Sequence, residues 1–98
     1  MKKKIAILGS TGSIGKTLIN LIKKDKNEFE ITLLTANKNY KELIKQAKYF
    51  KVRNLIISNK DSFNMAPRKL KNQKFKIYQN YNFFNKIFNK KNDFIMSS

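Results

Sequence analysis

Short apolar runs alternate with amphipathic stretches along this chain. The first run, Ile5–Leu8, is continuously hydrophobic, which is typical of a strand that is buried on both faces of a parallel sheet. Strands are therefore predicted at Ile5–Leu8, Phe29–Thr35, Leu55–Ile57, Phe75–Tyr78 and Phe94–Met96.

Between the predicted strands, apolar residues recur at helical spacing. In the first helix, which ends near Asp25, the apolar face is predicted to hold Ile14, Leu18, Leu21 and Ile22. In the second helix it is predicted to hold Tyr40, Leu43, Ile44 and Ala47. Two weaker helices are predicted at Ser62–Leu70, after the capping side chains of residues 58–61, and at Tyr81–Phe88.

This order of strand and helix predicts a parallel sheet with right-handed crossovers. We expect an α/β fold, a Rossmann-like parallel sheet with helices on both faces. A complete doubly wound domain normally returns with another helix after its last strand, so we expect the fold to be incomplete at the C-terminus. With 98 residues the chain has room for one domain, residues 1–98.

Three glycines separate the first predicted strand from the first helix: Gly9, Gly12 and Gly15. Gly9 permits a sharp turn out of the strand, and Gly12 lets a phosphate approach the backbone. Gly15 allows the helix to pack closely on the sheet. The pattern predicts a phosphate-binding turn.

Polar groups around these glycines support the same hypothesis. Thr11 and Ser13 add hydroxyl donors. The amides of Ser13 and Ile14 come at the helix N-terminus, where an anion is favoured. The alternative is a purely structural turn with a serine N-cap.

Two kinds of phosphate loop compete for this segment. The glycines form GxxGxxG, one residue longer in its first gap than the dinucleotide fingerprint GxGxxG. Gly15-Lys16-Thr17 matches the end of a P-loop, but Ser10 stands where the P-loop requires its first glycine. Because a P-loop wraps one phosphate chain of fixed size, the pattern favours the dinucleotide, with Lys16 as a solvated helix residue. A P-loop-like nucleotide-binding protein remains the alternative.

The second strand distinguishes NAD from NADP. NAD enzymes carry an acid at its carboxyl end, about 20 residues after the glycine motif, to bind the ribose 2′-hydroxyl. Glu28 and Glu30 lie at that distance, but at the opposite end of the strand. The carboxyl end leads instead to Asn37, Lys38 and Asn39. Lys38 would pair with a 2′-phosphate and Asn39 could donate to it, so we predict NADPH; the alternative for Lys38 is an ordinary solvated lysine.

The residue inventory favours binding over catalysis. The chain has no cysteine and no histidine, and its 6 acidic residues form no pair at catalytic or metal-binding spacing. We therefore predict no catalytic residue and no metal ligand. The apolar runs are too short for a membrane span or a signal peptide, so we expect a cytoplasmic protein without membrane partners.

The charge balance is strongly basic, with a formal net charge of +16. One interpretation is a nucleic-acid-binding module, since a basic surface attracts phosphates. The other is a compositional bias toward Lys and Asn, of the kind that an AT-rich coding sequence produces. The basic residues are divided evenly, eleven in each half of the chain, which favours the second interpretation.

Leu8–Gly15, followed by Thr35–Asn39, resembles the N-terminal NADPH-binding domain of the 1-deoxy-D-xylulose 5-phosphate reductoisomerase family. The GSTGSIG spelling is much narrower than a generic glycine loop. The resemblance continues through Leu43–Ala47 and Lys51–Leu55, and more loosely to Phe94–Met96.

The resemblance implies an enzyme of the non-mevalonate isoprenoid pathway. Such an enzyme rearranges 1-deoxy-D-xylulose 5-phosphate and reduces the product to 2-C-methyl-D-erythritol 4-phosphate, using NADPH and a divalent metal, Mg or Mn. It also implies cofactor-binding residues in this chain, at Gly9, Thr11, Gly12, Ser13 and Ile14 for the pyrophosphate turn and at Asn37, Lys38 and Asn39 for the adenosine ribose and its 2′-phosphate. Asn37 stands where many members have glycine, and asparagine tolerates the unusual backbone angles that glycine would supply.

Members of this family are much longer, and their metal ligands and substrate-phosphate residues follow the region that this chain covers. We therefore expect the chain alone to show no turnover. The resemblance also implies that the full-length parent takes a small phosphorylated sugar as substrate, forms a homodimer, and is located in the bacterial cytoplasm or in a plastid.

Overall fold

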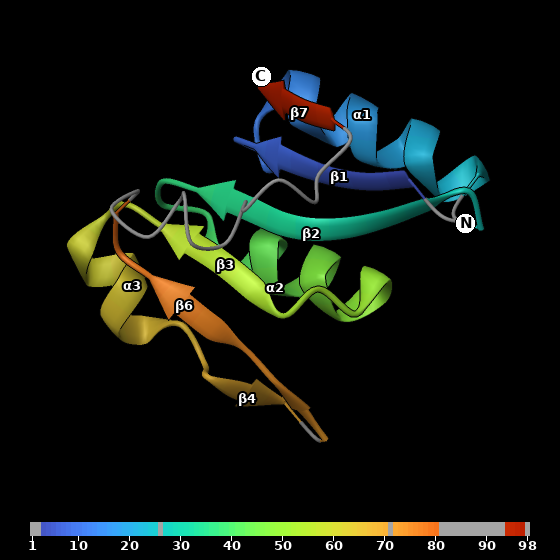
Figure 1. Ribbon diagram of the computed structural model, residues 1–98. Coiled ribbons are helices and arrows are strands. Elements are labelled where there is room, and N and C mark those ends of the chain that lie inside the picture. The colour runs from blue at the N-terminus through green and yellow to red at the C-terminus, as the bar shows by residue number, and fades with distance from the viewer. Residues whose placement is uncertain (1–2, 26, 71, 81–93, 98) are drawn as a thin grey trace.

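Five parallel strands form the main sheet of the computed structural model (Figure 1). The structure describes residues 3–25, 27–70, 72–80 and 94–97. In spatial order the strands are β6 (Lys76–Tyr78), β3 (Asn54–Ile57), β2 (Phe29–Ala36), β1 (Lys3–Leu8) and β7 (Phe94–Ser97). All five predicted strands are present, and the α/β, Rossmann-like parallel sheet is confirmed.

The described helices are α1 (Ser13–Lys24), α2 (Tyr40–Phe50) and α3 (Lys60–Met65). The buried and partly buried apolar residues of these helices join one core cluster with the strand residues that point to the same face, such as Ile5 and Leu55. The other face carries Ala6, Leu33 and Ile56, all fully buried. The helix predicted at Tyr81–Phe88 lies outside the described residues. The prediction that helices cover both faces of the sheet therefore stays a prediction.

A β-bulge in β2 decides which side chains face the helices. Ile5 pairs with Ile31, but the next residue, Ala6, pairs with Leu33, so Thr32 is the additional residue on β2. An extra residue reverses the alternation of the strand beyond it. The Thr32 hydroxyl donates a hydrogen bond to the Ile5 carbonyl at 3.2 Å, so the polar side chain of the bulged residue has a partner.

The predicted apolar face of α1 was wrong in two of its four members. Ile14 is 63% exposed and Leu21 is 53% exposed, whereas Gly15, Ile19 and Ile22 are buried. The helix packs through Gly15, which contacts the backbone of the preceding turn, and this contact sets the rotation of the helix. Ile14 and Leu21, each next to a buried position, therefore point outward. The predicted face of α2 is confirmed for Leu43, Ile44 and Ala47, all buried, and Tyr40 packs against them.

Helix α3 begins at Lys60, before the predicted Ser62, and ends at Met65, before the predicted Leu70. The Asn59 side chain caps it by accepting from the Ser62 amide at 3.0 Å. Ala66, at its end, has an extended ψ of 137°. A residue before proline is disfavoured in the helical region, so Pro67 stops the helix that was predicted to reach Leu70.

The chain beyond Pro67 forms a hairpin that the hydrophobic pattern did not predict. Strands β4 (Lys69–Leu70) and β5 (Gln73–Lys74) pair antiparallel in a separate two-stranded sheet. The Gln73 amide donates to the Ala47 and Val52 carbonyls at 3.1 and 3.3 Å. These bonds fasten the hairpin to the C-terminal end of α2. No helix in the described part of the chain is long and apolar enough to cross a membrane.

Replacing Gly15 by alanine should destabilise the fold. An added Cβ would lie 2.2 Å from the Gly9 carbonyl oxygen and 2.6 Å from the Ser10 Cα, both of them backbone atoms. We expect the free energy of unfolding to fall by about 1–3 kcal/mol, the usual cost of overpacking, in urea titrations followed by circular dichroism. The matched control is Asn20→Ala on the exposed side of α1, which should not destabilise. A Gly15→Ala variant as stable as the wild type would contradict the packing argument.

Candidate functional site

The glycine turn is hydrogen-bonded to the end of the neighbouring strand. Gly9 has a φ of 73°, a left-handed conformation that glycine adopts without strain. Its amide donates to the Thr35 hydroxyl at 2.7 Å, and the Ser10 amide donates to the Thr35 carbonyl at 3.0 Å. Thr35, which is buried near the carboxyl end of β2, therefore holds the turn against that strand.

Gly12 is the N-cap of α1 and has no conformational need to be glycine. Its φ of −76° and ψ of 175° are extended values that any residue adopts. No side chain caps the helix, so the serine N-cap of the structural alternative is wrong; Ser13 is the first helical residue. What glycine provides at position 12 is the absence of a side chain in front of the helix.

The amides of Ser13 and Ile14, in the N-terminal turn of α1, have no hydrogen-bond acceptor among the described residues. Gly12, Ser13 and Ile14 are exposed. The first amides of a helix have no acceptor within the helix, and the first turn of α1, all of which is described, contains no acidic residue. Exposed amides at the positive end of the helix dipole form a surface that suits a phosphate group.

The segment predicted to read the ribose lies beside this turn. Because β1 and β2 are parallel neighbours, their carboxyl ends meet at one edge of the sheet, and the bonds to Thr35 hold the two loops together there. Asn37, Lys38 and Asn39 are all exposed at this edge. In contrast, Glu30 pairs with Lys4 at the opposite edge. The structure thus brings both predicted groups together and keeps Glu28 and Glu30 away from them, whereas Glu42 lies in the first turn of α2, next to this segment.

The two asparagines also have structural partners. Asn39 is the N-cap of α2, and its Oδ1 accepts from the Glu42 amide at 3.2 Å. The Asn37 Oδ1 accepts from the Ser58 hydroxyl at 2.9 Å, which ties the end of β2 to the loop after β3. Both side-chain oxygens are used, and each side chain still has amide donors to offer a ligand.

The expectation of an unusual backbone at Asn37 was wrong. Among the described non-glycine residues, only Lys51, with a φ of 57°, has a positive φ. Asparagine at position 37 is instead explained by its bond to Ser58, which glycine could not make.

Two residues that position the turn were not predicted from the sequence. One is Thr35; the other is Gln46 of α2, which is 4% exposed and whose amide donates to the Ser10 carbonyl at 3.0 Å. The Gln46 Oε1 has no hydrogen-bond partner among the described residues. Each of these two residues could have been found in the sequence as a polar side chain inside an apolar pattern. Thr35 stands near the end of a buried strand, and Gln46 stands on the apolar face of α2 beside Leu43 and Ala47.

The P-loop alternative finds no support in this geometry. Lys16 is exposed on α1. The Thr17 hydroxyl donates to the Ser13 carbonyl at 3.1 Å, one turn back, rather than standing in the loop. Within the described residues, no group of three or more His, Cys, Asp or Glu side chains could hold a metal ion.

The chain is similar to known proteins of one family along most of its length. The family model for 1-deoxy-D-xylulose 5-phosphate reductoisomerase matches residues 5–98. A relative of that name from Pelagibacter ubique is 54% identical over 90 residues, which are 92% of this chain and 23% of the relative. Another, from Buchnera aphidicola, is 39% identical over 74 residues, 76% of this chain and 19% of the relative.

Solved structures of the same name share the fold. The Zymomonas mobilis reductoisomerase in complex with NADPH has a TM-score of 0.83 at 23% identity, over 97% of this chain and 25% of that one. A reductoisomerase with fosmidomycin and magnesium has a TM-score of 0.78 at 22% identity, over 95% of this chain and 24% of that one. These structures show a shared fold. The match of the family model over residues 5–98 establishes that the chain belongs to the 1-deoxy-D-xylulose 5-phosphate reductoisomerase family.

Proposed function

We propose that residues 1–98 form the NADPH-binding domain of a 1-deoxy-D-xylulose 5-phosphate reductoisomerase. The observation that carries this proposal is the juxtaposition of the glycine turn and the acid-free end of β2 at one edge of the sheet. In open α/β sheets, ligands bind at the carboxyl ends of the strands. The Zymomonas mobilis reductoisomerase, which has the same fold, is in complex with NADPH.

The cofactor pyrophosphate would bind in front of α1. Gly9 and Gly15 let the turn and the helix approach each other closely, and Gly12 leaves the first-turn amides uncovered. The amides of Ser13 and Ile14 would donate to the phosphate oxygens, with the hydroxyls of Thr11 and Ser13 beside them. An anion at this position also interacts favourably with the helix dipole.

The adenosine ribose and its 2′-phosphate would bind at Asn37, Lys38 and Asn39. The Lys38 ammonium would neutralise the phosphate, while the amide groups of Asn37 and Asn39 would donate to it or to the ribose. No carboxylate lies in this segment to repel the phosphate.

The whole enzyme would rearrange 1-deoxy-D-xylulose 5-phosphate and reduce the product to 2-C-methyl-D-erythritol 4-phosphate. This chain would hold the nicotinamide at the carboxyl edge of the sheet, where NADPH supplies the hydride. A divalent metal, Mg or Mn, finds no ligand group among the described residues and would bind to another part of the parent. The parent would act as a homodimer in the bacterial cytoplasm or a plastid.

Reversing the charge at position 38 tests the 2′-phosphate assignment. In the 98-residue chain, we expect Lys38→Glu to weaken NADPH binding by about tenfold or more, because a charge-assisted bond contributes about 1.5–3 kcal/mol. NADH, which lacks this phosphate, should bind almost as before. Isothermal titration with both cofactors measures the ratio, with Lys24→Glu at the far end of α1 as the matched control. Equal losses of affinity for NADPH and NADH in Lys38→Glu would contradict the assignment of Lys38 to the 2′-phosphate.

Blocking the helix N-terminus tests the pyrophosphate site and the P-loop alternative together. Gly12→Val should abolish measurable binding of NADPH, because the side chain would cover the first-turn amides. Lys16→Ala should leave NADPH affinity within about twofold, as expected for a solvated surface residue. ATP titrations of the same variants complete the comparison. Binding of ATP in preference to NADPH, with its loss in Lys16→Ala, would instead favour a P-loop protein.

Thr35→Val should weaken NADPH binding although Thr35 is not among the residues proposed to contact the cofactor. The valine keeps the shape of the side chain but removes the hydroxyl that accepts from the Gly9 amide, which costs about 1–3 kcal/mol in stability. The control is Thr32→Val, which removes a hydroxyl from the same strand away from the turn. Urea unfolding should show a loss in both variants, and titration a loss of affinity in Thr35→Val alone. An unchanged affinity in that variant would refute a positioning role for Thr35.

A further inference from the structure

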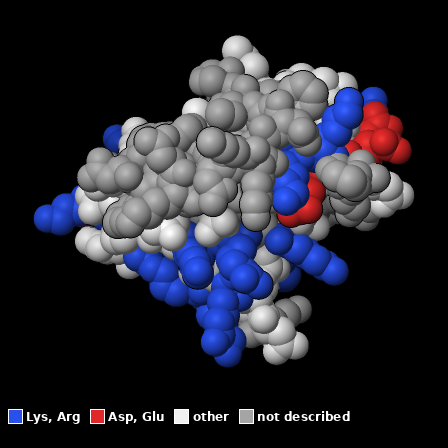
Figure 2. Space-filling view, viewed as in Figure 1, with Lys and Arg blue, Asp and Glu red and all other residues white. Residues whose placement is uncertain are grey.

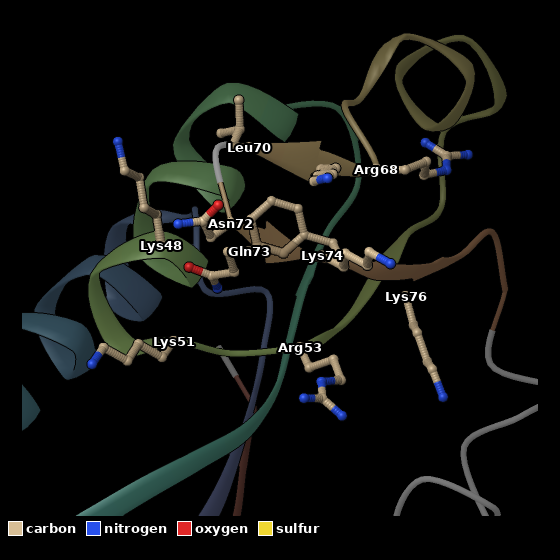
Figure 3. Close-up of a pocket in the computed structure, with 11 residues that line it drawn as sticks. Lys48, Lys51, Arg53, Arg68, Leu70, Asn72, Gln73, Lys74 and Lys76 are labelled. Atoms are coloured by element: carbon tan, nitrogen blue, oxygen red, sulfur yellow. The ribbon is translucent and has the colours of Figure 1, made fainter.

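A basic cavity of about 1070 Å³ lies at the amino edge of the sheet (Figure 3). Seven of the eleven residues that line it are Lys or Arg, and none of the eleven is acidic. In Figure 2, basic side chains gather on the part of the molecule where Figure 1 places β4 and β6. The cavity, with these side chains around it, is called the basic groove below.

The fold assembles the basic groove from separate parts of the chain. Lys48 and Lys51 come from the end of α2, Arg53 precedes β3, and Lys76 begins β6. Lys69 and Lys74 come from the β4–β5 hairpin, which Gln73 fastens to the Ala47 and Val52 carbonyls. The even division of basic residues along the sequence therefore does not extend to their distribution in space.

The position of the groove separates it from the proposed cofactor site. Arg53 and Lys76 lie at the amino ends of their strands, and α2 runs from the carboxyl edge back to this one. The glycine turn and Lys38 lie at the carboxyl ends of β1 and β2. A ligand in the groove would not compete with a dinucleotide.

Six of the seven cations are available to a ligand. The exception is Arg68, whose Nη1 donates to the Phe63 and Ala66 carbonyls at 2.8 and 2.7 Å while its guanidinium lies over the Phe63 ring. The remaining six, Lys48, Lys51, Arg53, Lys69, Lys74 and Lys76, are exposed. Like charges held around one hollow repel each other, and a polyanion that spans them relieves this repulsion.

We propose that the basic groove binds the phosphate backbone of duplex nucleic acid without sequence preference. A phosphate backbone repeats its charge at short intervals, so one strand can neutralise several separated cations. Single-strand binders add exposed aromatic rings for base stacking, but the one aromatic residue lining the groove, Phe75, is only 5% exposed. An acidic polypeptide would be expected to bury an apolar anchor, and among the described residues that line the groove the only apolar one apart from Phe75 is Leu70, already partly buried.

The test compares two triple variants of the 98-residue chain with equal loss of charge. One replaces Lys48, Lys74 and Lys76 by glutamine; the control replaces Lys24, Lys45 and Lys60, exposed residues of the three helices that do not line the groove. Binding to a short mixed-sequence DNA duplex is measured by fluorescence anisotropy over a range of salt concentrations. The groove variant should lose about 3 from the slope of log K against log salt, about 1 for each phosphate contact removed. The control variant should retain the wild-type slope.

A second measurement does not depend on any variant. Amide shifts of the wild-type chain, titrated with the duplex, should change around residues 48–53 and 68–76 and not around the glycine turn. Equal slope losses in both triple variants, shifts spread over the whole surface, or no binding at low salt would each overturn the proposal. Polyglutamate or tripolyphosphate displacing the duplex at equal charge concentration would also overturn it, in favour of another anion.

Discussion

The contact of Gly15 with the backbone of Gly9 and Ser10 is the constraint on which the rest of this structure depends. With no Cβ at position 15, α1 can begin directly against the turn that leaves β1. The contact also sets the rotation of α1, so Ile19 and Ile22 face the sheet while Ile14 and Leu21 face solvent. One missing side chain thus determines both how the helix packs and where its N-terminal amides point.

A second layer of hydrogen bonds converts this contact into a defined site. Thr35 binds the Gly9 and Ser10 amides, and Gln46 of α2 binds the Ser10 carbonyl, so the turn is held from β2 and from α2. Asn39 and Asn37 in turn fasten the loop after β2 to α2 and to the loop after β3. The exposed groups that are proposed to bind the cofactor are therefore held in place by buried residues that hydrogen-bond to their loops. A precise binding site requires such support.

Patterns that depend on neighbouring residues could be predicted from the sequence, whereas those that depend on distant ones could not. The strands, the glycine turn and the acid-free loop at Asn37–Asn39 follow from local spacing. The outward rotation of Ile14 follows from the contact of Gly15 with the backbone of Ser10, which is close in sequence but leaves no mark on the apolar spacing from which the helix face was predicted. The β4–β5 hairpin could not be predicted, because the carbonyls that hold it lie over twenty residues away. Pro67 does indicate locally that α3 ends before it. The prediction followed the apolar pattern instead and extended the helix beyond this proline.

The two edges of the sheet present positive potential by different means. At the carboxyl edge it comes from backbone amides and a helix dipole, which need glycines and a fixed geometry and suit one phosphate group in one orientation. At the amino edge it comes from long, flexible side chains such as Lys48 and Lys76, which suit a polyanion without a fixed register. A net charge of +16 could arise from composition alone, but a bias in composition does not select positions. The gathering of six exposed cations around one hollow is a property of the fold, and it is this property that calls for a functional explanation.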